Sequence, residues 1–385
     1  MNYLIAIFLA LSQIVILPTI SFRWIKEYSL QILIILSVAL LVWMKNKWIS
    51  SFLIWSFILF LMTKAFWIED AGEQTKYNVN IIAFLNFVNI VLYSVFYYVL
   101  HNIKLDRKLI YKTFCFIAIF QTIYVFIQKA NLDQFFYSIS LWHTPAKKAV
   151  SWCVGSWANE SLVSWCIALC SPFFLAFKEF RYKLGYILGF VAVCFTQVTA
   201  GIVGYILGFL FWLFYRYRKL AVLFIGIVLI IGIYGVSSGK LEYYLQDTHR
   251  FQVWKKAIEI WKAGSGNPEI LDRKTMTGYG LGSFRILFWA KAPEFRDDGH
   301  WAQAHNEYIQ ILFEQGVIGL GIILGLMWMT FYHFWKSKVG LIPITSLLIL
   351  SFISIVGFPM RTAIGAIPLI SLVLFERELW GEEAI

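Results

Sequence analysis

The side chains best suited to acid–base chemistry stand in one short run, between Trp301 and Gly316. Asn306 precedes an apolar segment with helical periodicity, so we expect it to be the N-cap of a helix that begins at Glu307. His305 would then lie at the mouth of that helix, where the positive end of the helix dipole disfavours imidazolium and leaves a neutral catalytic base. A single histidine at the end of a loop is ordinarily just solvated, which is the alternative interpretation.

A polar stripe follows on the same predicted helix. Glu307, Gln310 and Glu314 are three and four residues apart, so they share one face. At about 1.5 Å per residue, Glu314 would lie about two turns below the surface. A carboxyl group at that depth in a membrane is costly and usually functional, so we predict a catalytic role for Glu314. Substrate contacts are predicted for Asn306, Glu307 and Gln310. A buried structural ion pair is the alternative for Glu314.

A basic amphipathic segment runs from His249 to Lys262. Its apolar residues stand at helical spacing: Phe251, Trp254, Ile258 and Trp261. The pattern predicts a helix lying on the membrane interface, anchored by tryptophan. Arg250 stands one turn before Trp254 at the edge of this stripe, so its guanidinium can point inward along the bundle. An arginine that binds lipid phosphate is the alternative.

A glycine-rich turn spans residues 278–284. It is not a dinucleotide fingerprint, because no strand precedes it. Glycines at every second position suit a turn whose amides can approach a phosphate, so Gly280 and Gly282 are candidate substrate-binding residues. A purely structural turn is the alternative.

These segments must be positioned by membrane helices. Of the 385 residues, 60% are hydrophobic and 14% are charged, whereas globular domains carry about 25% charged residues. This composition excludes an ordinary soluble protein and a disordered chain. Four of the five cysteines stand in apolar runs, so no disulfide scaffold is expected. We predict an all-α, polytopic integral membrane protein.

Apolar runs long enough to cross a bilayer predict about twelve transmembrane helices. They lie near residues 2–20, 28–44, 48–66, 78–100, 109–128, 158–177, 184–198, 201–215, 220–236, 307–332, 339–356 and 362–379. The predicted division is nine spans in 1–236, one large outer loop in 237–306, and three spans in 307–385. One long tilted helix is the rival for the two short spans between residues 183 and 216.

The distribution of Lys and Arg predicts the direction of the spans. Basic residues are more frequent in the short turns that face the cytoplasm when the N-terminus is inside. The large loop then faces the outer, periplasmic side. Its own charges nearly cancel, so the net charge of +11 belongs mostly to the inner turns, and a nucleic-acid partner is unnecessary.

Taken in order, these motifs resemble the bacterial O-antigen ligase and O-antigen polymerase superfamily of membrane glycosyltransferases. The matching segments cover about residues 150–330 and are 155–159, 196–204, His249 and Arg250 with Trp254, 278–284, and 304–319. The resemblance implies metal-independent, inverting transfer of a glycan from a polyprenyl (undecaprenyl) pyrophosphate carrier to a hydroxyl acceptor such as lipid A-core, without a cofactor. Carried over by position, Arg250 would bind the pyrophosphate and His305 would take the acceptor's proton.

The resemblance also implies partners and a location. The expected partners are the lipid-linked donor, a glycolipid or glycan acceptor, and membrane lipids, with no nucleic acid. The expected location is the bacterial inner membrane, with the active site on the periplasmic side. Two rival functions remain. A polymerase would use similar chemistry on another acceptor, and a lipid or solute transporter would show internal repeats, which we do not find in the sequence.

One position departs from the family pattern. Where members often carry Thr-x-Ser-Arg-Gly, this chain has Ala200 in the place of the arginine. A pyrophosphate at a lipid interface needs more than one fixed cation. We predict that Arg361, the only charged residue in the turn 357–361, replaces it. An arginine that contacts lipid headgroups is the alternative, and Lys147 or Lys148 could also serve.

Overall fold

The computed structural model describes residues 106–133, 159–220, 248–263, 273–295, 303–337 and 341–357, with Tyr3, Ala6, Ile7, Ala10, Cys153, Gly155 and Pro359. Every regular element within these residues is helical, in agreement with the predicted all-α class. The predicted spans near 28–44, 48–66, 78–100 and 362–379 lie outside the described residues, as does Arg361, and those near 2–20 and 220–236 lie almost wholly outside them.

Three of the described helices are long and apolar enough to cross a membrane. They are Arg107–Lys129 (α5), Thr199–Arg216 (α10) and Glu307–Met329, which is the first part of α16 (Glu307–Ser337). Two shorter apolar segments accompany them, Glu160–Ala176 and Leu341–Val356 (α17). All five coincide with predicted spans, whereas the total of about twelve stays a prediction.

Local capping explains where α5 and α8 (Glu160–Cys170) begin. The Asp106 side chain accepts a first-turn amide of α5 at 3.0 Å, and the Asn159 side chain does the same for α8 at 2.9 Å. The predicted single span at 158–177 consists of two helices, because α8 ends at Cys170 and the 3₁₀ helix η3 (Ser171–Ala176) follows it. Pro172 explains the change, because proline has no amide hydrogen and its ring clashes with the preceding turn.

The segment between residues 183 and 216 forms two helices, α9 (Phe180–Phe195) and α10. The rival prediction of one tilted helix is therefore wrong. Thr196, Gln197 and Val198 make the turn, with Gln197 in the left-handed region at φ 58°. The Thr196 hydroxyl donates to the Val193 carbonyl at 2.7 Å, which ends α9.

Glycines on α10 allow its neighbours to approach closely. A Cβ at Gly201 would lie 1.9 Å from Ser164 Oγ on α8, and one at Gly208 would lie 2.4 Å from Ile349 on α17. Gly204, between them, faces Ile353 of α17. Small residues spaced three and four apart are a common basis of helix contacts in membranes. This stripe packs α10 antiparallel to α17, with Gly204 near the end of α17 that carries Val356.

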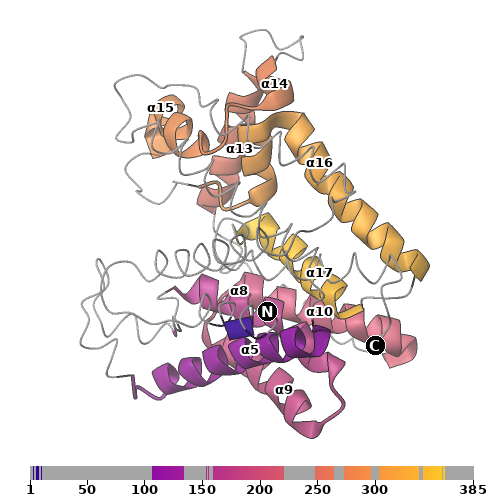
Figure 1. Ribbon diagram of the computed structural model, residues 1–385. Helices are drawn as coiled ribbons and strands as arrows, with labels where there is room; N and C mark the ends of the chain where they lie inside the picture. The colour runs from indigo at the N-terminus through magenta and orange to yellow at the C-terminus, as the bar shows by residue number, and fades with distance from the viewer. Residues whose placement is uncertain are drawn as a thin grey trace, which may run out of the picture.

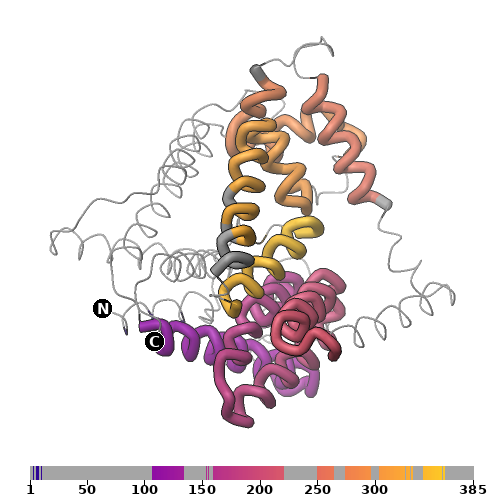
Figure 2. Tube along the Cα trace, turned by 90° about the vertical axis from the view of Figure 1, so that its right-hand side faces the viewer, coloured from indigo at the N-terminus to yellow at the C-terminus, as the bar shows by residue number. Residues whose placement is uncertain are grey.

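A second unit lies at the opposite end of the molecule from α5, α8, α9 and α10 (Figure 1, Figure 2). It comprises α13 (Thr248–Lys262), α14 (Arg273–Thr277), the π-helix η4 (Phe284–Phe288), α15 (Trp289–Lys291), the 3₁₀ helix η5 (Pro293–Phe295) and the start of α16. It has its own apolar core, centred on Tyr279, Phe284, Phe288 and Phe313. The large loop of the prediction is thus folded where it is described.

The predicted helix at 249–262 is confirmed as α13, but it buries a different face. Its buried residues are Val253, Ala257 and Ile260, whereas Phe251 is 63% exposed. The two tryptophans are partly buried, and their indole nitrogens donate to protein carbonyls instead of serving only as interfacial anchors. The reason is that both faces are apolar, so tertiary contacts choose between them.

Candidate active site

The predicted cap at the start of α16 is confirmed. The Asn306 side chain accepts the Ile309 amide at 3.0 Å, and the Asn306 carbonyl accepts the Gln310 amide at 3.0 Å. Asn306 is buried, so this cap is shielded from solvent. Its hydrogen bonds fix the position at which the chain enters the helix, directly after His305.

His305 stands in a backbone that is held from both sides. It adopts φ 51°, a left-handed conformation that is uncommon for a residue with a side chain. The preceding residue, Ala304, is fully buried, and both of its polar backbone groups are bonded. Its amide donates to Gln310 Oε1 at 3.0 Å, and its carbonyl accepts Trp254 Nε1 at 2.7 Å. A strained conformation persists only where surrounding contacts hold it, and such residues cluster at functional sites.

The predicted polar stripe is buried and connected. Glu307 and Gln310 are each 2% exposed, and Glu314 is 0% exposed. Gln310 bridges the stripe, because its Nε2 donates to Glu314 Oε1 at 3.0 Å while its Oε1 accepts the Ala304 amide. The buried carboxyl is therefore linked through one amide side chain to the backbone next to His305.

The predicted span at 307–332 was expected to be one helix, but its backbone breaks at Gly316, where φ is 67° and ψ is −167°. In a continuous helix, the carbonyls of Phe313 and Glu314 would bond to amides four residues later. They accept instead the amides of Tyr279, at 3.0 Å, and Gly280, at 2.9 Å. The glycine turn thus satisfies the carbonyls that the break leaves open.

Contact between the two backbones explains why both segments contain glycine. A Cβ at Gly278 would lie 2.3 Å from the Glu314 carbonyl carbon, and a Cβ at Gly316 would lie 2.3 Å from the Met276 oxygen. Both glycines also have φ of +67°, which side chains disfavour. The Gly280 amide is occupied here by the Glu314 carbonyl, and a substrate role for Gly280 stays a prediction. A substrate role for Gly282, at φ 84°, stays a prediction.

Arg250 joins the second unit to the membrane helices. Its Nη1 donates to the Val356 carbonyl at 3.3 Å, and its side chain is partly buried. Val356 is the last residue of α17, where carbonyls lack helical partners and the helix dipole is negative. The guanidinium therefore points toward the bundle, at the end of α17 that precedes the turn predicted to carry the second cation.

Two lysines that the sequence motifs did not single out flank the glycine turn. Lys274 Nζ lies 5.6 Å and Lys291 Nζ 4.7 Å from the centre of the Tyr279 ring. The Tyr279 hydroxyl donates to the Ile260 carbonyl at 2.8 Å, which fixes this ring beneath them. The sequence motifs did not predict that these two lysines lie near one ring, because one belongs to α14 and the other to α15, and a local pattern relates only near neighbours in the chain. The two ammonium groups add positive charge beside the turn.

An exposed ion pair fastens α13 to η5. Lys256 Nζ lies 3.0 Å from Glu294 Oε1. A hydrogen bond from the Glu294 backbone and then the bond from Lys256 lower the pKa of this carboxyl below its usual value. The pair orients the surface of the second unit and takes no part in the buried network.

A further buried polar group lies at the end of α5. The Gly155 amide donates to Gln128 Oε1 at 2.8 Å, and Gln128 Nε2 donates to Asp133 Oδ2 at 2.9 Å. Gly155 and Asn159 are the described ends of the first family motif, and they bond to α5 and α8 respectively. Ala200, at the position of the missing arginine, lies in the first turn of α10. Within the described ranges, no three His, Cys, Asp or Glu side chains group so as to hold a metal ion.

Comparison with known proteins identifies the central part of the chain. Residues 184–324 match the family model described as O-antigen ligase, from α9 into α16. The matched segment contains Arg250, the glycine turn and the run from His305 to Glu314. No curated protein matched the chain. The family indicates glycosyltransferase activity of the O-antigen ligase or polymerase type on glycan and lipid substrates. The resemblance seen in the motifs is therefore confirmed over residues 184–324, the segment that matches the O-antigen ligase family model.

Proposed function

We propose that this protein transfers a glycan from a polyprenyl pyrophosphate carrier to a hydroxyl group of a glycolipid acceptor, as an O-antigen ligase does. The acceptor oxygen attacks the anomeric carbon of the donor glycan and gives its proton to His305. The bond from that carbon to the pyrophosphate oxygen breaks, and the polyprenyl pyrophosphate leaves with the electron pair. Attack from the side opposite the leaving group inverts the anomeric centre.

The observation that carries this proposal is the network that holds the residue before His305. Trp254 and Gln310 bond to the two polar groups of the Ala304 backbone, and Gln310 also bonds to Glu314. A general base must stay within hydrogen-bond reach of the acceptor hydroxyl, and a displacement of about 1 Å can cost about 10²-fold in rate. In this proposal Gln310 and Glu314 act on the reaction by positioning His305.

Arg250 supplies positive charge for the leaving group. It stands four residues before Trp254 on α13, so the two Cβ atoms are about 6 Å apart. Trp254 bonds to the residue before His305, so Arg250 and His305 lie in the same region of the fold. Pyrophosphate is already an activated leaving group, so neutralising its charge and positioning a base are the main tasks left to the protein.

Arg361 remains our candidate for the second cation. It follows Val356, the acceptor of the Arg250 hydrogen bond, by five residues, and a chain of five residues reaches at most about 18 Å. R361A should weaken transfer strongly, and R361K should restore only part of it because the planar fork is lost. Adding A200R to R361A should recover activity. Unchanged donor affinity in R361A would end this assignment and leave Lys274 or Lys291 as candidates.

The proposal is tested with purified full-length protein, a polyprenyl pyrophosphate-linked glycan and a panel of acceptors. We expect product on a lipid A-core acceptor and, for H305A, a loss of about 10²–10⁴-fold in turnover with donor binding retained. H333A, near the other end of α16, is the matched control and should keep normal turnover. Near-normal transfer by H305A would remove His305 from the mechanism.

The acceptor panel also separates the rival functions. Extension of a lipid-linked glycan in place of transfer to lipid A-core would identify a polymerase that uses the same residues. Movement of the lipid-linked glycan across vesicles without a new glycosidic bond would identify a transporter and would overturn the enzymatic proposal.

A further inference from the structure

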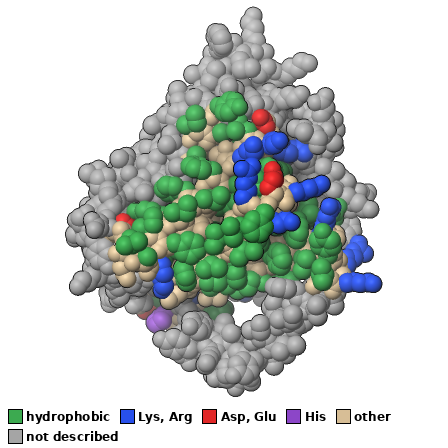
Figure 3. Space-filling view, turned by 90° about the horizontal axis from the view of Figure 1, so that it is seen from below, with side chains coloured by type: hydrophobic (Ala, Val, Ile, Leu, Met, Phe, Trp, Pro, Cys, Tyr) green, Lys and Arg blue, Asp and Glu red, His purple; other side chains and the backbone are tan. Residues whose placement is uncertain are grey.

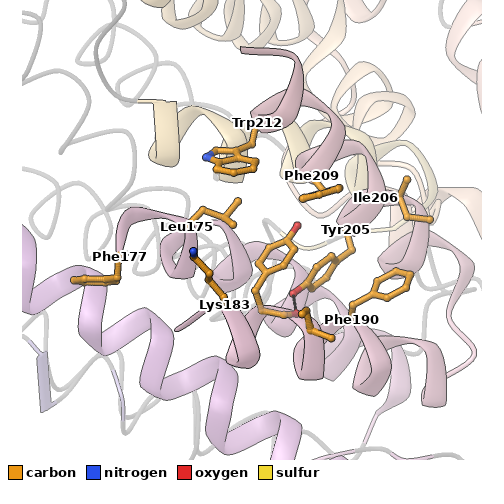
Figure 4. Close-up of a pocket in the computed structure, with 10 residues that line it drawn as sticks. Leu175, Phe177, Lys183, Phe190, Tyr205, Ile206, Phe209 and Trp212 are labelled. Atoms are coloured by element: carbon orange, nitrogen blue, oxygen red, sulfur yellow. Dashed lines mark hydrogen bonds between the residues drawn. The ribbon is translucent and has the colours of Figure 1, made fainter. Parts of the chain in front are cut away.

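An apolar pocket of about 410 Å³ lies between η3, α9 and α10, away from the site described above. Figure 4 shows aromatic and aliphatic side chains from all three helices surrounding it, with Lys183 near Leu175. Its principal walls are Tyr186, Phe190, Tyr205, Phe209 and Trp212.

The interior of the pocket offers few polar partners. The Tyr205 hydroxyl donates to the Tyr186 carbonyl at 2.6 Å, so this hydroxyl is satisfied within the protein. The rings pack on one another, with Tyr186 and Tyr205 at 4.8 Å and Phe190 and Tyr205 at 5.5 Å between ring centres. Lys183 is the only charged residue among the lining residues, and it stands at one end of the pocket. An occupant must therefore be apolar along most of its length and anionic at one end.

The charged end of the pocket is strongly basic. Because α9 and α10 are antiparallel, the beginning of α9 and the end of α10 meet there. Six exposed basic residues lie in these two segments: Lys178, Arg181, Lys183, Arg216, Arg218 and Lys219. Glu179 is the single acidic residue between positions 178 and 220. Figure 3 shows blue side chains gathered mainly along one side of a largely hydrophobic face of this part of the molecule.

Aromatic residues mark the same end as a membrane interface. Tyr182 packs on Phe177 at 4.2 Å, and Arg181 lies 5.1 Å from the Tyr182 ring. Trp212 and Tyr217 have ring centres 6.1 Å apart. Trp and Tyr concentrate at the level of lipid headgroups, and clustered Lys and Arg beside membrane helices attract anionic headgroups.

We propose that this pocket binds one acyl chain of an anionic glycerophospholipid, with the lipid phosphate at Lys183 and the neighbouring basic residues. The pocket extends over eight residues of α9, from Lys183 to Phe190, and the seven steps between them span about 10 Å at 1.5 Å per residue. One leaflet of the hydrocarbon core is about 15 Å deep. The pocket thus covers about two thirds of the depth that an acyl chain occupies.

The polyprenyl donor fits this pocket less well than a phospholipid. The donor's pyrophosphate is assigned to Arg250, near the end of α17 that contacts Gly204. The basic end of the pocket lies beyond Trp212, and Arg216 is twelve residues, or about 18 Å, further along α10 than Gly204. An anionic headgroup at the pocket is therefore well separated along α10 from the leaving group. This separation makes the lipid site independent of the proposed reaction.

The test is native mass spectrometry of the full-length protein in detergent, titrated with dioleoyl phosphatidylglycerol or dioleoyl phosphatidylcholine. The two lipids share acyl chains and differ in headgroup charge. A lysine at a membrane surface contributes about fivefold in affinity for an anionic lipid. K183Q should therefore lower phosphatidylglycerol affinity about fivefold, and K183E should lower it further. K108Q, which removes another exposed lysine at the start of α5, is the matched control and should leave it unchanged.

A second variant tests the apolar part of the site without relying on charge. Ile187 lines the pocket and is 59% exposed, so I187W should fill the pocket without disturbing the fold. It should weaken both lipids by a similar factor, unlike K183Q. The proposal is overturned if K183Q and I187W both bind phosphatidylglycerol as wild type does. It is also overturned if polyprenyl phosphate displaces the phospholipid with higher affinity, since that result would assign the pocket to the carrier.

Discussion

Replacing Gln310 by leucine should uncouple the buried stripe of α16 from the backbone before His305. Leucine has a similar size and is a good helix former, so the helix should persist. The substitution removes two hydrogen bonds, one from the Ala304 amide at 3.0 Å and one to Glu314 at 3.0 Å. It therefore isolates the bridging role of one side chain.

The magnitude follows from burial at both ends of the bridge. Ala304 is 0% exposed, so its amide would be left buried without this acceptor, at a cost of about 1–3 kcal/mol. Glu314, also 0% exposed, would lose a donor, which adds about 1–2 kcal/mol. Together these effects predict about 2–5 kcal/mol of lost stability. Release of the His305 backbone should lower turnover about 10²-fold through mispositioning of the base.

The assay compares Q310L with Q315L, a matched control in the same helix. Gln315 is also buried, at 4% exposed, but its Oε1 bonds to none of the described residues. Thermal unfolding in detergent measures stability, and transfer at saturating and limiting donor separates turnover from donor binding. We expect Q310L to melt lower than Q315L and to lose turnover with little change in KM for the donor.

Equal melting temperatures and equal turnover for Q310L and Q315L would refute the positioning argument. A loss of stability in Q310L with full turnover per folded molecule would also refute it, because the network would then be purely structural.

The remaining predictions concern the helix break, the topology and an ion pair. G316A should fold poorly, since its Cβ would lie 2.3 Å from a backbone oxygen and φ is +67°; a melting temperature near wild type would contradict the close contact. In a cysteine-free background, a cysteine at Asp297 should react with a membrane-impermeant thiol reagent in intact cells and one at Lys219 should not, and reversed labelling would move the site to the cytoplasm. The pKa of Glu294 is lowered in the folded protein, so the contribution of its pair with Lys256 should be full at neutral pH and lost as pH falls through that lowered pKa. The melting temperature of E294Q should therefore differ from wild type at pH 7, and the difference should vanish once the pH lies below that lowered pKa.

Much of the local structure could be predicted because its causes lie within a few residues. Asn306 caps α16 through the amide three residues later, which is a contact that a sequence pattern encodes directly. The turn between α9 and α10 likewise uses neighbouring residues, with the Thr196 side chain bonded to the carbonyl three residues before it. Apolar composition and span length predicted helices of membrane-crossing length for the same reason, since both are properties of short windows.

Contacts between distant segments were decided only by the tertiary structure. Arg250 bonds to a carbonyl 106 residues away, and Trp254 bonds to one 50 residues away. The break at Gly316 is stabilised by amides of the glycine turn at 278–284. In the sequence these are two separate glycine motifs, whereas in the fold they form one hydrogen-bonded contact. The sequence could not predict which face of α13 is buried, for a similar reason. Two adjacent apolar stripes have the same helical period, and packing against Tyr279 and Phe284 selects one of them. A sequence determines which residues can cap, bury or bond, but the partner of each is chosen by the packing of the whole chain.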